Sequence, residues 1–310
     1  MQSISSAGKA GQKENMKKSN MLKIHAAFTG LLLLFSISAP AENPKIKIVT
    51  SFYPMYVAVL NVAGNVPGVT VTNMTKQVSG CLHDYQLSPD DMKILSNADI
   101  FVVNGAGMES FMEKVIKDRP NLKIVNASKG IDLIRDKNGI ENPHVWVSIS
   151  LHKKQIDNIA AGLSKCDPEN ARTYRKNADA YILKLEELRI EIAKFTRTIS
   201  NRDIITFHEA FPYFAKEFGL NVVAVIEREP GSDPDARELA NTIETIKKEK
   251  IRVLFAEPQY STKIAEIIAR ETKAKIYTLD PVVSGPFAAD AYLKIMEKNL
   301  VVLREALEEK

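Results

Sequence analysis

Short runs rich in β-branched residues alternate, from residue 45 onward, with stretches in which apolar residues recur every three or four positions. Runs of the first kind predict strands, and stretches of the second kind predict amphipathic helices. The predicted strands are residues 45–51, 69–73, 100–104, 122–126, 203–207, 221–226, 251–257 and 274–279. The predicted helices are residues 53–63, 88–97, 109–117, 210–218, 235–249, 261–271 and 287–307. This alternation is typical of the α/β class, in which helices cover mainly parallel sheets.

The alternation stops in the middle of the chain. After Asp167 and Pro168, no glycine and no further proline occurs up to about Ile199, and the apolar residues keep helical spacing. We therefore expect one long helix of about 30 residues, roughly 45 Å at 1.5 Å per residue. The mature chain then divides into an N-terminal α/β lobe (42–166), a linking helix (167–200) and a C-terminal α/β lobe (201–310). A single rigid helix between two lobes favours limited hinge opening.

The first 41 residues have the pattern of a secretory signal peptide and leader. Three lysines, at positions 17, 18 and 23, precede an apolar run at 26–37, and Ala39-Pro40-Ala41 is a small-x-small cleavage site. This pattern predicts cleavage after Ala41 and a periplasmic protein. The apolar run is too short for a permanent membrane span. No cysteine follows it directly, which argues against a lipid anchor, and the translation start at Met1, Met16 or Met21 is left open.

The charge balance changes once the leader is set aside. Of the 42 basic and 38 acidic residues, five lysines and one glutamate lie within residues 1–41, so the remaining chain carries 37 of each sign. Proteins that bind nucleic acids need an excess of basic residues to contact phosphates. We therefore expect no nucleic-acid partner.

The exported chain has two cysteines, Cys81 and Cys166. An oxidising compartment permits a disulfide between them. Cys81 also lies two residues before His83, so it is an alternative soft metal ligand. The sequence leaves both interpretations open.

Four histidines follow the leader, and three of them are candidate metal ligands: His83, His144 and His208. His208 follows a predicted strand, as does Asp280, and ligands gather at the carboxyl ends of parallel strands. His83 and His144 fall in loops of the first lobe. Three neutral imidazoles and one carboxylate suit a divalent ion such as Zn²⁺, and its binding should weaken as the imidazoles protonate near about pH 6.

Several histidines and one glycine-containing segment also fit other interpretations. A single histidine is more often a surface or core residue than a ligand, and His152, which begins the polar stretch LHKKQIDN, is expected to be exposed to solvent. His208-Glu209 begins like the HExxH motif of metalloproteases, but Pro212 stands where the second histidine is required. The segment 105–107 lacks the third glycine of a dinucleotide-binding loop and predicts a turn.

Several segments in fixed order carry a resemblance to a known family: IVTSFYPMY, HDYQLSPDD, VVNGAGME, NPHVWVS, TFHEAFPYFAKEFGL and YTLDP. They resemble the zinc/manganese-type (cluster A-I) substrate-binding proteins of bacterial ABC importers, over about residues 45–308. The resemblance implies two α/β lobes bridged by a long helix, with a metal ion between them. It assigns the ligand roles to His83, His144, His208 and Asp280.

The resemblance also bears on the choice of metal. In this family a histidine at the third ligand position goes with zinc and a glutamate with manganese, so His208 favours zinc. Glu257 lies at a predicted strand end and is a candidate to support the ligands. The chain departs from the family pattern in two ways. No histidine lies between His83 and His144, so the His-rich loop of many zinc members is absent, and Asn142 replaces the usual acidic residue.

The sequence thus predicts an exported binding protein and not an enzyme. We expect a monomer that captures a divalent metal ion, Zn²⁺ first and Mn²⁺ or Fe²⁺ as alternatives, and delivers it to the membrane permease of an ABC importer. One competing hypothesis is an exported zinc hydrolase, which would need an open coordination position and a general base. A role in cell adhesion or metal storage is a third.

Overall fold

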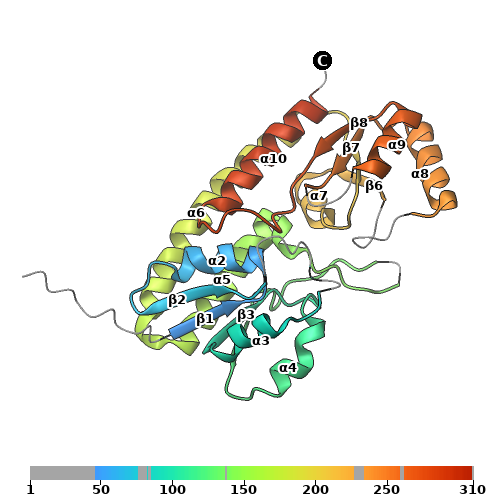
Figure 1. Cartoon of the computed structure of the whole chain (residues 1–310). Coiled ribbons are helices and arrows are strands. Elements are labelled where there is room, and N and C mark those ends of the chain that lie inside the picture. The colour runs from blue at the N-terminus through green and yellow to red at the C-terminus, as the bar shows by residue number, and fades with distance from the viewer. Residues whose placement is uncertain are drawn as a thin grey trace, which may run out of the picture. The chain divides into compact units, whose positions relative to one another are not determined.

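Two four-stranded parallel sheets form the centre of the protein (Figure 1). The computed structural model describes residues 46–75, 82, 85–136, 138–226, 234–258 and 262–308. The first sheet has the order β2-β1-β3-β4 and contains β1 (Ile46–Thr50), β2 (Val69–Asn73), β3 (Ile100–Val103) and β4 (Lys123–Asn126). The second has the order β6-β5-β7-β8 and contains β5 (Asp203–Thr206), β6 (Asn221–Val225), β7 (Val253–Ala256) and β8 (Lys275–Thr278). The two lobes therefore repeat one topology, and the predicted α/β class is confirmed.

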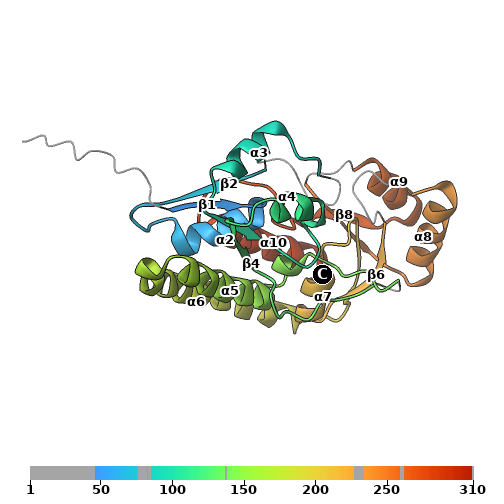
Figure 2. The same ribbon diagram turned by 90° about the horizontal axis from the view of Figure 1, so that it is seen from below.

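Helices cover both faces of each sheet. The first lobe contains α2 (Tyr53–Ala63), α3 (Pro89–Ser96), the 3₁₀ helix η1 (Ser110–Met112), α4 (Glu113–Lys117), the 3₁₀ helix η2 (Val145–Val147) and α5 (Ile149–Cys166). The chain continues through the 3₁₀ helix η3 (Pro168–Asn170), α6 (Ala171–Thr196), α7 (Pro212–Phe218), α8 (Ala236–Lys248), α9 (Lys263–Thr272) and α10 (Ala291–Leu307). Helices α5 and α6 pack against each other (Figure 2).

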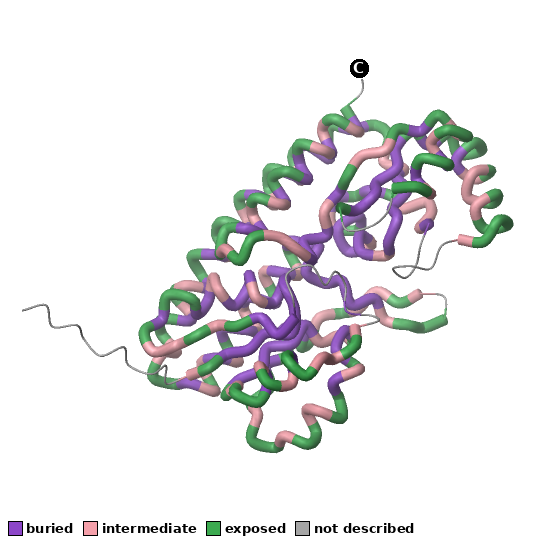
Figure 3. The backbone as a smooth tube through the Cα atoms, viewed as in Figure 1, coloured by how far each residue is buried: buried purple, intermediate pink, exposed green. Residues whose placement is uncertain are grey.

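The inner strands β3 and β7 are buried along their whole length, whereas the edge strands are partly exposed (Figure 3). In β7, Val253 and Phe255 enter a large core that includes residues of both lobes, whereas Leu254 and Ala256 enter a second core with α8 and α9. The first lobe has its own outer core, which includes residues of β3 and α3. Successive side chains of a strand point to opposite faces, so a strand covered on both sides consists of apolar residues throughout.

The long helix is present, but it is shorter than expected. Asp167 is extended, with a φ of −139°, and Pro168 begins the 3₁₀ turn η3 before the 26 residues of α6. Helix α10 packs beside α6 and also contacts α2 in the first lobe. The precise domain boundaries, 42–166, 167–200 and 201–310, stay predictions.

Hydrogen bonds also connect the C-terminal segment to α2 of the first lobe. Tyr53 Oη donates to Pro286 O at 2.9 Å, and Asn61 Nδ2 donates to Ala289 O at 2.7 Å. Both donors lie on α2, the first helix of the chain that the structure describes. The start of the first lobe is thus covered by the end of the chain.

The expectation that His152 is exposed was wrong. Helix α5 begins at Ile149, and His152 lies on its buried face with Ile156 and Ile159. The His152 ring is fully buried, stacks on Tyr292 with 4.2 Å between ring centroids, and burial lowers its pKa to about 4. The adjacent lysines suggested a solvated face, but residues at three- and four-residue steps share one side of a helix.

Several predictions fall on residues outside the described part of the chain. These are the leader and cleavage site within 1–41, and Cys81. Cys166 is a free, partly buried cysteine at the end of α5. Within the described ranges, no helix is long and apolar enough to cross a membrane.

His152 should make stability depend on pH. Its pKa in the folded protein, about 4, lies below the ordinary value of 6.5, so the unfolded chain binds more protons between these values. The contribution of His152 to the free energy of unfolding is therefore fully present above about pH 6.5. It decreases as pH falls, by about 2 kcal/mol between pH 7 and pH 5. We expect His152→Phe to remove this contribution from urea unfolding measured with a chelator present. If His152→Phe and the unaltered protein lose the same unfolding free energy between pH 7 and pH 5, the prediction is contradicted.

Candidate metal centre

The second lobe brings two functional side chains to the point where its strand order reverses. Because β5 lies between β6 and β7, the crevice between β5 and β7 is the position where α/β sheets bind ligands. His208 follows β5 by two residues, and Glu257 follows β7 directly. His208 Nδ1 lies 3.6 Å from Glu257 Oε2, and both side chains are buried. A carboxylate beside one ring nitrogen orients the other nitrogen toward a metal.

His144 comes from the first lobe and meets His208. The two rings lie edge to face, with 4.7 Å between centroids and 86° between planes. Asn142 Oδ1 accepts a hydrogen bond from His144 N at 2.9 Å and lies 2.9 Å from His144 Nδ1. An amide oxygen can only accept, so Nδ1 carries the proton and Nε2 keeps the lone pair that a metal needs.

The orientation of the Asn142 amide is fixed by its other contacts. Asn142 Nδ2 donates to Glu209 O at 2.8 Å, which places the amide oxygen toward His144. Tyr213 Oη donates to Asn142 O at 2.7 Å and accepts from Ile134 N at 2.9 Å. Asn142 therefore connects His144 to the residue that follows His208.

The backbone around His144 is held by further buried side chains. Asn104 Nδ2 donates to Pro143 O at 3.0 Å, and Trp146 Nε1 donates to Pro281 O at 2.7 Å. The first bond comes from the end of β3, and the second reaches the residue after Asp280. These bonds leave the His144 loop little freedom relative to either lobe.

Asp280 is influenced by the charge of the same carboxylate that lies beside His208. Burial raises the pKa of Asp280; the hydrogen bond from Val282 N, at 2.8 Å, lowers it, and the charge of Glu257 raises it. Asn299 Oδ1 accepts from Asp280 N at 2.9 Å, and Asn299 Nδ2 donates to Asp280 O at 2.7 Å. The pKa of Glu257 is also raised, mainly by burial. A cation would relieve the cost of holding two buried carboxyl groups together.

The structure thus brings together His144, His208 and Glu257, and the charge of Glu257 acts on Asp280. His83, the fourth predicted ligand, lies outside the described residues. Among the residues that are described, no group of three or more His, Cys, Asp or Glu side chains is arranged to hold a metal ion. The complete set of four ligands therefore stays a prediction.

Sequence reasoning missed a buried carboxyl group in the first lobe. Glu109 accepts hydrogen bonds from Ser51 Oγ at 2.7 Å, Asn104 N at 2.7 Å and Gly105 N at 2.9 Å. Burial raises the pKa of Glu109 to about 7, although these bonds act in the opposite direction. The turn predicted at 105–107 is present, with Gly105 at a φ of 76°, and Glu109 lies in this turn and not at the start of the predicted helix 109–117. Glu109 positions Asn104, which in turn bonds to the residue before His144.

The chain matches a known family over most of its length. The family described as zinc-uptake complex component A, periplasmic (ZnuA) matches residues 48–306. The chain belongs to this family. The predicted family is thereby confirmed, and so is the prediction of a solute-binding protein and not an enzyme.

Two of the relatives have names that refer to zinc. The chain is 31% identical over 291 residues to the high-affinity zinc uptake system protein ZnuA of Bacillus subtilis. The aligned region covers 87% of this chain and 90% of that protein. It is 29% identical over 314 residues to the zinc-binding lipoprotein AdcA of Streptococcus pneumoniae, which covers 95% of this chain. The chain spans 62% of the length of AdcA.

Solved structures of related proteins have the same fold. The binding protein FpvC of Pseudomonas aeruginosa, in complex with Mn²⁺, superposes with a TM-score of 0.77 at 30% identity, covering 84% of this chain and 98% of that one. The laminin-binding protein Lmb of Streptococcus agalactiae, described as having adhesin and metal-transporting activity, gives a TM-score of 0.77 at 30% identity over 85% of this chain and 100% of that one. The two-lobed architecture with a long helix is thereby confirmed.

Replacement of Asn142 should weaken metal binding without unfolding the protein. We expect Asn142→Ala to lower zinc affinity by about 10- to 100-fold, because the His144 ring loses the acceptor that fixes its orientation. The measurement is a competition titration against a chromophoric chelator.

Asn158→Ala is the matched control for this prediction. Asn158 donates to Ala127 O at 2.7 Å and Lys129 O at 2.9 Å within the first lobe. Its replacement should leave zinc affinity unchanged. Equal affinities of the two variants would show that Asn142 does not orient a ligand.

Proposed function

We propose that this protein captures Zn²⁺ outside the cytoplasm and delivers it, as a monomer, to the membrane permease of an ABC importer. The observation that carries the proposal is the meeting of His144 and His208 at 4.7 Å, one from each lobe, in a chain of the zinc-uptake family. Two imidazoles supplied by different lobes bind one ion only while the lobes stay together. Relative movement of the lobes is then a route to release.

In this proposal His83, His144, His208 and Asp280 are the ligands of the transported ion. His144 binds through Nε2, because its Nδ1 faces Asn142. Glu257 stays beside His208 Nδ1 and orients that ring. The charge of Asp280 offsets part of the charge of the ion.

The residues on either side of His83 support its place in this set. Leu82 is fully buried in the large core, and Tyr85 N donates to Leu82 O at 3.0 Å. Tyr85 Oη also donates to Asp91 Oδ2 at 2.8 Å, at the start of α3. The chain therefore enters and leaves the His83 region at fixed points of the first lobe.

The donor set favours zinc over manganese. Three imidazoles and one carboxylate suit Zn²⁺, whereas Mn²⁺ prefers more oxygen ligands. The FpvC structure contains Mn²⁺, so a protein of this fold accommodates either ion and the ligands must decide between them. Fe²⁺ is the remaining alternative.

The leader should be removed on export. We expect cleavage after Ala41, so that the mature protein begins at Glu42, because the small-x-small sequence follows an apolar run of signal-peptide length. Mass spectrometry of the protein recovered from the extracytoplasmic fraction measures this end. A mature chain that retains the apolar run, or carries a lipid, would contradict the expectation.

Loss of one ligand should sharply reduce zinc binding. If roughly 10–16 kcal/mol of binding free energy is shared by four ligands, His208→Ala costs about 3 kcal/mol, or about 100-fold in affinity. Equilibrium competition titration of metal-free protein measures the loss. His152→Phe is the control, because it removes a buried histidine that contacts Tyr292 and not the proposed ligands; its zinc affinity should match that of the unaltered protein.

Two further measurements separate this proposal from its competitors. In an equimolar mixture of Zn²⁺ and Mn²⁺ the protein should retain zinc, and retention of manganese would refute the choice of metal. A panel of hydrolase substrates should show no turnover that depends on His208. Turnover abolished by His208→Ala would instead favour the exported hydrolase.

A further inference from the structure

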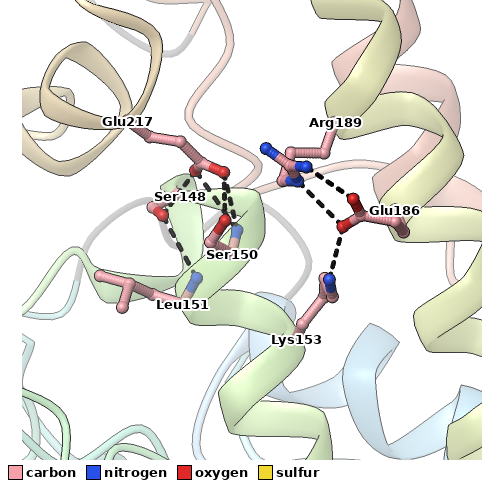
Figure 4. Close-up of polar contacts among 7 residues, drawn as sticks. All are labelled: Ser148, Ser150, Leu151, Lys153, Glu186, Arg189 and Glu217. Carbon is pink, nitrogen blue, oxygen red and sulfur yellow. Dashed lines mark hydrogen bonds and ion pairs between the residues drawn. The ribbon is translucent and has the colours of Figure 1, made fainter. Parts of the chain in front are cut away.

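The N-terminus of α5 is capped by a side chain from the other lobe (Figure 4). The Glu217 carboxylate, on α7, accepts hydrogen bonds from Ser148 Oγ at 2.6 Å, Ser150 Oγ at 2.5 Å and Ser150 N at 3.1 Å. Ser148 is also the N-cap of α5, and its hydroxyl accepts from Leu151 N at 3.2 Å. A carboxylate at this end of a helix satisfies a free N–H group and interacts favourably with the helix dipole.

These contacts join the two segments that carry the facing imidazoles. Helix α5 begins at Ile149, shortly after His144, and α7 begins at Pro212, shortly after His208. Glu217 therefore ties the helix after one ring to the helix after the other. Along the chain, α6 lies between α5 and α7, so Glu217 adds a direct connection to the one that Asn142 makes between His144 and Glu209.

A neighbouring ion-pair cluster provides a comparison. Arg189 donates to Glu186 Oε1 at 2.6 Å and Oε2 at 2.9 Å, and Lys153 donates to Glu186 Oε2 at 2.5 Å (Figure 4). The bond from Lys153 connects α5 to α6, and the bonds from Arg189 lie within α6. The pKa of Arg189 is raised, chiefly by its hydrogen bonds to Glu186 and further by the charge of Glu217. Glu186 is thus a glutamate in the same electrostatic environment whose hydrogen bonds do not reach α7.

We propose that Glu217 is a positioning residue for metal capture: by fixing α7 on the N-terminus of α5, it sets the separation of the His144 and His208 rings. This inference rests on the function proposed above. Ligands that are already held at the separation the ion requires lose less conformational freedom when it binds. The same bonds would have to stretch or break when the lobes move to release the ion.

The experiment compares Glu217→Ala, Glu217→Gln and the control Glu186→Gln with the unaltered protein. Zinc affinity is measured by chelator competition, and Co²⁺ serves as a probe because its visible absorption reports coordination geometry. Urea unfolding of the metal-free proteins measures stability separately. A role in stability alone would change the unfolding curve but not the Co²⁺ spectrum.

We expect Glu217→Ala to bind zinc about 10- to 100-fold more weakly and to alter the Co²⁺ spectrum. Glu217→Gln keeps one acceptor oxygen and should recover part of the affinity. Glu186→Gln should match the unaltered protein in affinity and spectrum. Equal affinities of Glu217→Ala and the unaltered protein would overturn the proposal, as would equal losses in Glu217→Ala and Glu186→Gln.

Two further results keep the test decisive. If Glu217→Ala does not fold, Ser150→Ala removes only the hydroxyl donor to Glu217 and keeps the bonds from Ser150 N and Ser148 Oγ. A smaller loss of affinity with a shifted Co²⁺ spectrum supports the role, and no change overturns it. If the unaltered protein binds no zinc and His208→Ala is no different, the proposed function fails. If it binds zinc and Glu217 has no influence, only this inference fails.

Discussion

Buried hydrogen bonds across the two lobes constrain the segment that carries His144. Backbone groups removed from water must find partners, since leaving one unpaired costs about 1–3 kcal/mol. Along this segment the partners come from both lobes: Asn104 bonds to Pro143 O, Tyr213 bonds to Asn142 O, and the indole of Trp146 bonds to Pro281 O. Displacing the segment would break several of these bonds together. The position of the His144 ring is therefore a property of the whole interface.

The two lobes share one strand order, and each has a buried carboxyl group in the segment that follows the corresponding strand. Glu109 follows β3, and Glu257 follows β7, the corresponding strand of the second sheet. Glu109 is surrounded by hydroxyl and backbone donors and shapes a turn. Glu257 lies beside an imidazole and is coupled electrostatically to Asp280. One carboxyl group thus organises its own lobe, and the other contributes negative charge where a cation is expected.

The alternation of apolar patterns was sufficient to predict the strands and most helices, because a two-sided parallel sheet requires apolar runs bounded by amphipathic helices. Strand-end logic likewise identified His208 and Asp280, whose positions depend on local chain order. The functions of Asn142 and Glu217 were not predictable in this way. Each depends on a hydrogen bond between residues 67 positions apart: Asn142 Nδ2 to Glu209 O, which fixes the amide beside His144, and Ser150 N to Glu217 Oε1. Such pairings follow from tertiary packing alone.

The return of the last helix to the first has a consequence for biosynthesis. Met296 and Leu300 of α10 belong to the same core as Val57 and Val59 of α2, so the earliest part of the fold is finished by the latest part of the chain. Helices α2 and α10 are synthesised more than 200 residues apart. Until α10 emerges from the ribosome, α2 retains an uncovered apolar surface. The core shared by α2 and α10 therefore cannot be completed until the last helix has been synthesised.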